Sequence, residues 1–416
     1  MSQSSGNNSA ATDARHGRLP RSSATRTVLR YLAVALAVTV ASAGSVVAIA
    51  VWNVARTAPP GVSLAGESGA PPDIGSIEGG ANFLLVGSDS GGGDPRYGQR
   101  GEHLNDVTIL LHISEDHSRA TVVSFPRDLF VAIPACSTDD GGEFPAISRQ
   151  KINVSLSRGG LACTVLTVSK LTGLEIPFAA KIEFNGVIEM ANAIGGVEVC
   201  VATAIHDRQI GFDLEAGMRT LQGWNASQFL RVRYGVGDGS DLGRISNQTV
   251  FLSALFRKVK TAETLANPAK LYALAMAAVA NMELSNSLRN VNQIISLALA
   301  LKDIQASDIV FAKFPTVEVP NGLAPIDGDA DALIDAIKAD RPVKLTGSTG
   351  IGSALRVTEQ GGSTPPTSSS SPTTQASPSP SGSPTGVPDG TVELPGSVTG
   401  QTAAQETCSK GQTAGG

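Results

Sequence analysis

The feature that most constrains this chain is a long uncharged apolar stretch near its N-terminus, covering residues 31–55. A helix rises about 1.5 Å per residue, so this stretch is long enough to cross a hydrocarbon core of about 30 Å. Basic residues precede it and should stay on the cytoplasmic side: Arg15, Arg18, Arg21, Arg26 and Arg30. We therefore predict a single-pass protein of the cell membrane, with a cytoplasmic N-terminus and an extracellular remainder.

The alternative for the same stretch is a cleaved signal peptide, because residues 41–43 (Ala-Ser-Ala) resemble a small-residue cleavage site. The apolar run continues well beyond these residues, and this length favours an uncleaved anchor. Trp52 would then lie near the outer membrane interface, where aromatic residues are common.

Composition divides the chain into five segments. Residues 1–27 are polar and basic, which predicts a disordered cytoplasmic segment, and residues 28–55 form the transmembrane anchor. Residues 56–80 are rich in proline and glycine and are predicted to be a linker. Residues 81–357 form the folded extracellular domain. Residues 358–416 are mostly Ser, Thr, Pro and Gly, so we predict a low-complexity disordered tail that buries too little apolar surface to fold.

Charge and cysteine content narrow the function classes. The formal net charge is −5 and aromatic residues make up only 4% of the chain, so nothing indicates a basic, aromatic-rich surface for nucleic acid. None of the four cysteines lies in a Cys-x-x-Cys pair, which argues against a zinc or thioredoxin-like site. Disulfides are allowed in an exported domain. Cys136 with Cys163 is the preferred pair because both flank one loop region, and the remaining connectivity stays open.

Apolar runs and helical periodicity alternate through the folded domain. Continuous apolar runs typical of buried strands occur at 82–86, 106–113, 120–125, 179–183, 196–201 and 309–315. Helical spacing occurs at 161–171, 186–194, 224–229, 249–259, 268–280, 288–301 and 329–339. This alternation predicts an α/β fold, an α-β-α sandwich around a central mixed β-sheet, preceded by the transmembrane helix.

Two carboxylates lie at the ends of apolar runs. Asp89 closes the first strand-like run and Asp106 opens the second. Neighbouring strands would bring these ends together, and two carboxylates completed by phosphate oxygens and water are a common way to hold Mg²⁺. The alternative is that both residues only cap turns or helices, and from the residues alone both interpretations stay open.

Arginines gather in and around a glycine-rich segment. Arg231 and Arg233 are two residues apart, so on a strand they would face the same side as a phosphate clamp, whereas on a helix they would not. Arg244 and Gln248 are four apart and would share a helical face if a helix starts near Asp241, which could be its N-cap. The alternative is a solvated surface of exposed arginines.

Further charged residues follow the same pattern. Arg127 and Asp128 come directly after the apolar run at 120–125 and one proline. Lys151 and Asn153 are two apart and would share one face of an extended segment. Forked arginines combined with carboxylates suit a metal-bound phosphate or pyrophosphate.

The order of these motifs resembles the LytR–CpsA–Psr (LCP) family of membrane-anchored cell-wall phosphotransferases, in its actinobacterial form. The resemblance covers roughly residues 80–260 and the N-terminal anchor. It rests on six motifs in the family's order: NFLLVGSD (82–89), NDV (105–107), SFPRDL (124–129), KIN (151–153), IGGV (194–197), and RVR (231–233) continued by GDGSDLGRI (237–245) and Gln248.

The resemblance implies an activity and a set of site residues. LCP proteins transfer a glycopolymer from a polyprenyl-diphosphate carrier to the 6-hydroxyl of N-acetylmuramic acid in peptidoglycan, and release polyprenyl phosphate. The implied Mg²⁺ ligands are Asp89 and Asp106. The implied catalytic residues are Arg127, Arg231, Arg233 and Asp241, and the implied pyrophosphate-binding residues are Arg127, Lys151, Arg231, Arg233, Arg244 and Gln248. The acceptor hydroxyl needs a base, for which Asp241 and Asp128 are both candidates.

The sequence departs from the family pattern at three places, and two of them, residues 105–107 and 246–248, keep the family's aspartate and glutamine. Gly91 stands where the family usually has an arginine after the first aspartate, and Arg96 or Arg100 could substitute for it. Two other functions would use the same residues: a polyprenyl-pyrophosphate hydrolase, in which water replaces the sugar hydroxyl, and a non-enzymatic regulator that binds polyprenyl phosphates. The intact set of aspartates and arginines argues against the regulator.

Overall fold

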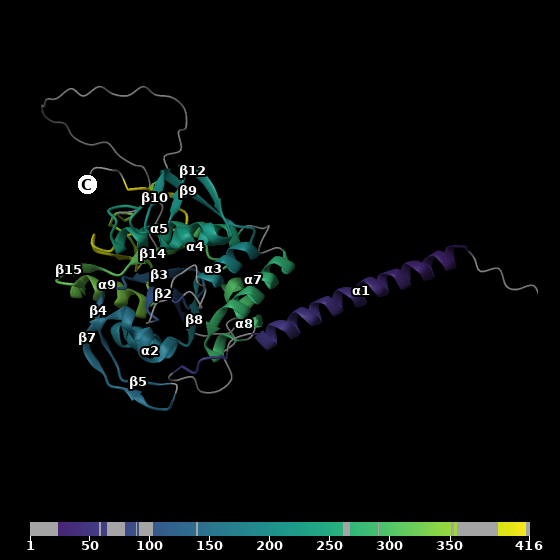
Figure 1. Cartoon of the computed structure of the whole chain (residues 1–416), viewed down its shortest axis with the longest axis horizontal. Coiled ribbons are helices and arrows are strands. Elements are labelled where there is room, and N and C mark those ends of the chain that lie inside the picture. Colours follow the sequence, from purple (N-terminus) through teal and green to yellow (C-terminus); the bar gives the residue numbers. More distant parts are fainter. Residues whose placement is uncertain are drawn as a thin grey trace, which may run out of the picture. The chain divides into compact units, whose positions relative to one another are not determined.

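The computed structural model describes residues 24–57, 60–64, 80–88, 90, 103–138, 140–260, 267–289, 291–350, 353–355 and 390–412. These residues belong to two compact units, residues 1–56 and residues 57–416 (Figure 1). Every described residue that the sequence assigns to the site lies in the second unit.

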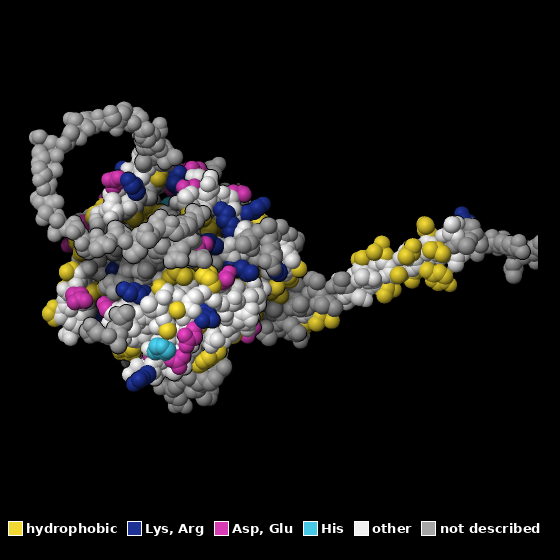
Figure 2. All heavy atoms as spheres, turned by 90° about the horizontal axis from the view of Figure 1, so that it is seen from above, with side chains coloured by type: hydrophobic (Ala, Val, Ile, Leu, Met, Phe, Trp, Pro, Cys, Tyr) yellow, Lys and Arg dark blue, Asp and Glu magenta, His cyan; other side chains and the backbone are white. Residues whose placement is uncertain are grey.

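The first unit contains the helix α1, Ala24–Thr57, where the sequence predicts the membrane anchor. Its segment Thr25–Ser42 is long and apolar enough to cross a membrane, although by length and composition a signal sequence fits as well. Apolar side chains are exposed along this helix, among them Leu29, Leu32 and Leu36 (Figure 2). The predicted apolar helix is therefore confirmed. The predicted disorder of residues 1–27 is wrong for residues 24–27, which form the first turn of α1, and residues 1–23 lie outside the described residues.

A seven-stranded sheet forms the centre of the second unit. Its order is β13 (Met282–Leu284), β8 (Phe178–Ile182), β1 (Ala81–Ser88), β2 (Asn105–Ile113), β3 (Ala120–Phe125), β14 (Ile309–Lys313) and β20 (Gly400–Thr402). β1 pairs with β8 and β3 pairs with β14 in parallel, and the other neighbours are antiparallel. The predicted mixed sheet is confirmed.

Helices cover both faces of this sheet. On one face, Leu84, Val86 and Leu110 point into a core shared with α2 (Ser155–Thr172) and α9 (Asp327–Lys338). Leu85 and Ile109 alternate with these residues and face the other side. The helices on that side are α3 (Phe184–Ala193), α4 (Gly223–Arg231) and α5 (Asp241–Lys260), with α7 (Pro268–Asn281) beside α3 and α8 (Val291–Ala300) beside α7 (Figure 1). This is the predicted α-β-α sandwich.

A second sheet packs against α4 and α5. Its order is β12 (Gly217–Leu221), β9 (Val197–Thr203), β21 (Thr407–Lys410) and β18 (Ser353–Leu355). Val199 of β9 and Phe229 and Phe251 of the helices meet in a separate apolar core. Two-stranded pairs complete the domain: β4 (Phe130–Ile133) with β7 (Ile147–Lys151), β5 (Cys136–Ser137) with β6 (Glu143–Phe144), β10 (Ile205–Asp207) with β11 (Phe212–Leu214), β15 (Thr316–Val319) with β16 (Gly322–Pro325), and β17 (Val343–Lys344) with β19 (Val392–Glu393).

The predicted disordered tail at 358–416 was wrong for residues 390–412. β20 is an edge strand of the main sheet, and β21 lies between β9 and β18 in the second sheet. Leu394 and Val398 are buried in the main core. The Ser, Thr, Pro and Gly content of the whole segment masked these few apolar residues, whose partners lie far away in the sequence. The folded domain therefore extends beyond residue 357, while residues 358–389 lie outside the described residues.

The predicted linker at 56–80 also has a folded part. The backbone N–H of Val62 donates to the carbonyl of Leu284 at 2.9 Å, and its carbonyl accepts from Asn286 at 2.9 Å. Leu64 is buried in the main core. Residues 60–64 thus pack beside β13, and residues 65–79 lie outside the described residues.

All four cysteines form disulfides. The preferred pair, Cys136 with Cys163, is confirmed, and it ties β5 to α2. The second bridge joins Cys200 of β9 to Cys408 of β21. The sequence alone left this second pairing open.

Candidate active site

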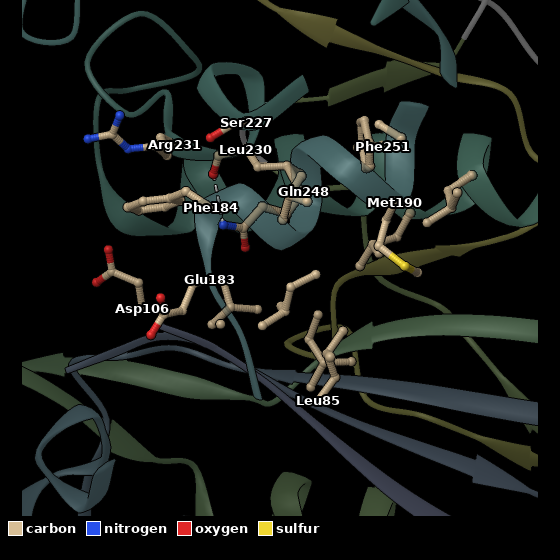
Figure 3. A pocket seen from close by; sticks show the side chains of 18 of the residues that line it. Leu85, Asp106, Glu183, Phe184, Met190, Ser227, Leu230, Arg231, Gln248 and Phe251 are labelled. Carbon is tan, nitrogen blue, oxygen red and sulfur yellow. Dashed lines mark hydrogen bonds between the residues drawn. The ribbon is translucent and has the colours of Figure 1, made fainter. Parts of the chain in front are cut away.

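A cavity of about 300 Å³ lies between the main sheet and helices α3, α4 and α5. Most of its walls are apolar, from Leu85, Val107, Ile109 and Ile182 of the sheet and from Val187, Met190, Leu230, Phe251, Leu252 and Leu255 of the helices. One end is polar, where Ser88, Asp106, Glu183, Arg231, Arg244 and Gln248 line it (Figure 3). Such a cavity suits a ligand with an apolar chain and a charged head.

Asp106 holds two arginines at the polar end. Arg127 Nη1 donates to Asp106 Oδ1 at 2.6 Å, and Arg244 Nη1 donates to Oδ2 at 3.1 Å. The antiparallel pairing of β2 with β3 places the start of β2 beside the end of β3, and so brings Asp106 to Arg127. Burial raises the pKa of Asp106, but the two arginines outweigh it and hold this pKa below its usual value. Asp106 is therefore charged at neutral pH.

Asp241 is the second buried carboxylate of this network. A helix does start here as predicted, but Asp241 is the first residue of α5 and not its N-cap, since Ser240 Oγ accepts from the N–H of Gly243. Arg244 Nη2 lies 2.6 Å from Asp241 Oδ1. Arg127 Nε lies 3.5 Å from the same oxygen. Burial raises the pKa of Asp241 above its usual value, and the two arginines only partly oppose this. Arg127 and Arg244 thus share two carboxylates, which fixes both guanidinium groups.

Arg231 and Arg233 do not lie on one strand face. α4 ends at Arg231, and the chain then leaves the helix at Val232, so the two arginines diverge. Arg231 lines the cavity, donates to Gln228 Oε1 at 2.6 Å and lies over the ring of Phe184, 4.5 Å from its centroid (Figure 3). Arg233 instead donates through Nε to the carbonyl of Gly239 at 3.3 Å and is not among the residues that line the cavity.

Gln248 and Lys151 occupy different places. Gln248 lines the cavity one helical turn beyond Arg244, as the predicted shared face requires, and its Nε2 donates to the carbonyl of Leu230 at 3.0 Å. Lys151 lies outside the cavity lining and donates to Asp128 Oδ1 at 2.7 Å. Asp128 also lies 3.7 Å from Arg127 Nε, so Lys151 reaches the network through Asp128.

The comparison with protein families shows the family of the chain. The sequence model of the LytR_cpsA_psr family matches residues 65–339. The chain belongs to the LytR–CpsA–Psr family. The matched region contains every predicted site residue.

Several LytR–CpsA–Psr relatives resemble the chain over part of their length. Cell wall biosynthesis protein LcpA of Corynebacterium glutamicum is 27% identical over 303 residues, 65% of this chain and 56% of LcpA. Probable cell wall biosynthesis protein LcpB of the same species is 30% identical over 268 residues, 62% of this chain and 61% of LcpB. The polyisoprenyl-teichoic acid–peptidoglycan teichoic acid transferase TagU of Enterococcus faecalis is 28% identical over 186 residues, 45% of this chain and 56% of TagU. The chain therefore spans less than two thirds of each of these proteins.

Solved structures of the family share the fold. The LytR-Csp2A-Psr enzyme from Actinomyces oris superposes with a TM-score of 0.51 and 20% identity, covering 68% of this chain and 96% of that one. TagV of B. subtilis superposes with a TM-score of 0.50 and 21% identity, covering 64% of this chain and 98% of that one. At this level of identity the likeness confirms the fold alone.

Some predicted site residues are not described by the structure, and one residue of the site was not predicted from the sequence. Asp89, Gly91, Arg96 and Arg100 lie outside the described residues, so the metal ligand and the substitute arginine remain predictions. Glu183 was missed: it lines the polar end of the cavity beside Asp106 and accepts a hydrogen bond from Ser90 Oγ at 2.8 Å (Figure 3). Glu183 directly follows β8. A carboxylate at the end of a strand is the signal that identified Asp106 as a candidate, and the same signal could have identified Glu183.

Proposed function

We propose that this LytR–CpsA–Psr protein is a membrane-anchored phosphotransferase that moves a glycopolymer from a polyprenyl-diphosphate carrier to peptidoglycan. The observation that carries the proposal is an apolar cavity whose polar end is lined by Arg231 and Arg244, and Arg244 is paired with Asp106 and Asp241. A prenyl chain is apolar and a diphosphate is anionic, so one cavity suits both parts of the carrier. The name of the relative TagU, which describes transfer from a polyisoprenyl-linked polymer to peptidoglycan, supports the same reaction.

In the proposed reaction, the hydroxyl of N-acetylmuramic acid attacks the phosphorus that carries the glycopolymer. The bond from this phosphorus to the bridging oxygen breaks, and polyprenyl phosphate leaves with the electron pair. Arg127, Arg231 and Arg244 would bind the diphosphate and stabilise the negative charge of the leaving phosphate. Because Asp106 and Asp241 hold two of these arginines before the substrate arrives, little reorganisation is needed.

A carboxylate would take the proton of the acceptor hydroxyl. The two candidates differ in access, because the side chain of Asp128 is 24% exposed and that of Asp241 only 7%. Asp128 also lies at the edge of the network, between Arg127 and Lys151. We therefore favour Asp128 as the base and assign Asp241 to the positioning of Arg244.

Mg²⁺ is the cofactor that the family resemblance implies. Each carboxylate oxygen of Asp106 accepts one arginine N–H and keeps a second lone pair. This donor set fits Mg²⁺, which usually binds through one or two carboxylates together with substrate phosphates. Asp106 and Asp89 would hold the ion, which when bound supplies positive charge to the diphosphate.

The proposed location follows from the N-terminal helix. α1 would anchor the protein in the cell membrane, with the basic N-terminus in the cytoplasm and residues 57–416 outside. This arrangement keeps the site near the carrier, whose prenyl chain enters from the bilayer, and on the same side of the membrane as peptidoglycan.

The test uses the full-length protein in detergent with a polyprenyl-diphosphate-linked sugar and peptidoglycan fragments. We expect attachment of the sugar to peptidoglycan with matching release of polyprenyl phosphate, both lost with EDTA and both reduced at least about 100-fold in Arg231→Ala. Arg219→Ala is the matched control, because the side chain of Arg219 bonds only backbone carbonyls of Glu215 and Ala216 within the described residues.

Other outcomes lead to the alternative functions. Release of polyprenyl phosphate without attachment of sugar to peptidoglycan would identify a hydrolase. Tight binding of the carrier without any release would identify a binding protein.

A further inference from the structure

The segment that joins α4 to α5, residues 232–240, is here named the arginine loop. Arg231 precedes it, Arg233 lies within it and Asp241 follows it. A displacement of this loop would therefore move three site residues relative to the cavity. Its backbone is held from two sides by residues to which no function has been assigned.

Asp207, at the end of β10, holds the arginine loop from one side. Its side chain is buried, and Oδ2 accepts hydrogen bonds from the backbone N–H groups of Arg233 and Tyr234, both at 3.0 Å. Oδ1 accepts from the N–H of Gln209 at 3.0 Å. Within the described part of the chain, Asp207 forms no ion pair. A buried carboxylate is costly unless hydrogen bonds compensate it, and here the backbone of the arginine loop supplies two of the three bonds.

The C-terminal residues hold the arginine loop from the other side. The N–H of Gly237 donates to the carbonyl of Lys410 at 3.0 Å, and the N–H of Gln412 donates to the carbonyl of Gly235 at 2.9 Å. Between these bonds, Gly411 and Val236 form an antiparallel bridge. Gly411 is needed there, because a Cβ would lie 1.9 Å from the carbonyl oxygen of Ala204.

The same C-terminal strand also contacts the helices that flank the loop. Ser409 Oγ donates to Asn247 Oδ1 in α5, and Asn247 Nδ2 donates to the carbonyl of Phe229 in α4 at 2.6 Å. Ser409 and Asn247 are fully buried. The strand is thus connected to both helices as well as to the loop between them.

The Cys200–Cys408 disulfide ties this strand to the domain. The two cysteines lie opposite each other in the parallel pairing of β9 with β21. They are 208 residues apart in the chain, and the Ser-, Thr- and Pro-rich residues 358–389 lie between them. Cross-linking such distant residues restricts the chain more than closing a short loop does. The family match ends at residue 339, so Cys408 and the rest of the C-terminal strand lie outside the matched region, whereas Cys200 lies inside it.

We propose that Asp207 and residues 410–412 are positioning residues that clamp the arginine loop, and that the Cys200–Cys408 disulfide keeps the C-terminal half of this clamp in place. The proposal deepens the proposed function and rests on it, because the loop joins Arg231, which would bind the diphosphate, to Asp241, which positions Arg244. It gives the C-terminal segment a part in substrate binding. Reduction of this disulfide would loosen the loop and weaken the binding of a diphosphate.

The test compares Cys200→Ser/Cys408→Ser with the matched control Cys136→Ser/Cys163→Ser, which removes the bridge between β5 and α2. Both are made in the full-length protein in detergent. Hydrogen exchange measures the protection of the backbone N–H groups of residues 232–240. Calorimetric titration with geranyl diphosphate, a short soluble prenyl diphosphate, gives Kd and stoichiometry.

We expect Cys200→Ser/Cys408→Ser to lose protection in the arginine loop and to raise Kd about tenfold at unchanged stoichiometry. The control variant should keep both values, whatever its melting temperature. A merely structural role would lower the stoichiometry, because fewer molecules would be folded, and would leave Kd unchanged.

Unchanged protection of residues 232–240 in Cys200→Ser/Cys408→Ser would overturn the proposal. If that variant does not fold, Asp207→Asn replaces it: the amide substitutes a donor for one acceptor oxygen, and loop protection should fall in the same way. A wild-type protein that does not bind geranyl diphosphate would refute the proposed function instead, and hydrogen exchange would still decide whether the clamp exists.

Discussion

Two cavities of nearly equal volume lie at opposite ends of β2, about 300 Å³ where the strand begins and about 310 Å³ where it ends. Both contain arginine and aspartate. In the first, Asp106 and Arg244 line the end of an apolar space, and Arg127, which is not among the lining residues, also pairs with Asp106. In the second, Arg119 lies 3.7 Å from Asp340, which also accepts from His112, and polar residues such as Ser114, Thr121 and Thr402 line the walls.

The difference shows that an arginine–aspartate pair alone does not define the proposed function. The first cavity combines a converging pair of arginines with a wall that can enclose a prenyl chain. In the second cavity Arg119 pairs with Asp340, and the other cations that line it are Arg341 and Lys344. We therefore expect transfer to depend on the first cavity and to be insensitive to the second.

The largest effect is expected for Arg244→Ala. This change removes the hydrogen bonds to Asp106 and the ion pair with Asp241, and leaves two buried carboxylates with Arg127 as their remaining arginine partner. The rate of polymer transfer should fall by about 100- to 1000-fold, as for the loss of other fixed donors to a developing charge. Single-turnover assays with a polyprenyl-diphosphate-linked sugar would measure it.

The matched change in the second cavity is Arg119→Ala. Arg119 also pairs with two aspartates, Asp116 and Asp340, but it lies away from the apolar cavity. Its loss should change the transfer rate less than about twofold. A loss similar to that of Arg244→Ala would break the distinction between the two cavities.

The apolar wall gives an intermediate effect. Met190 lies at the end of the first cavity away from Asp106 (Figure 3). Met190→Trp should fill this end and weaken binding of a long polyprenyl diphosphate about tenfold, while geranyl diphosphate, which stays near the arginines, should bind as before. Titration calorimetry with both ligands would test this.

Met218→Trp is the control for the wall variant, because Met218 is exposed on β12 and the substitution is the same. It should leave both affinities unchanged. If Met190→Trp weakened the binding of both ligands equally, the end of the cavity at Met190 would not be the place where the far part of a long prenyl chain binds.

Patterns within a single strand or helix predicted those site residues that lie at a strand end or one helical turn apart. Asp106 and Arg127 were each recognised as candidates from their place at the end of an apolar run, and the pairing of β2 with β3 in the structure brings them together. Arg244 and Gln248 could be placed together by the helical repeat. These are short-range consequences of the periods of strands and helices.

The remaining features depend on contacts that no local pattern contains. Whether Arg231 and Arg233 share a face depends on where α4 ends, and that boundary is set by packing. The role of residues 390–412 depends on Cys408 meeting Cys200, which the composition of the segment hides. Asp207 appeared unremarkable in the sequence because its partners are backbone N–H groups of a distant loop.

The smallest effect is expected at His112, in the second cavity, and concerns stability alone. Burial lowers the pKa of His112 below its usual 6.5, although its hydrogen bond to Asp340 opposes the shift. The unfolded chain therefore binds a proton at a pH where the folded protein does not. This contribution to stability is complete above about pH 6.5 and is lost as the pH falls from there towards the folded-state pKa.

The melting temperature of the wild type should thus fall between pH 7.5 and pH 5.5. His112→Gln should reduce this fall by a few degrees at most, on the order expected for about 1 kcal/mol in a domain of this size. Differential scanning calorimetry at both pH values would measure the difference. The transfer rate of His112→Gln at pH 7.5 should equal that of the wild type, because the second cavity takes no part in binding the carrier. A reduced transfer rate at unchanged stability would instead show that the second cavity affects transfer at the first.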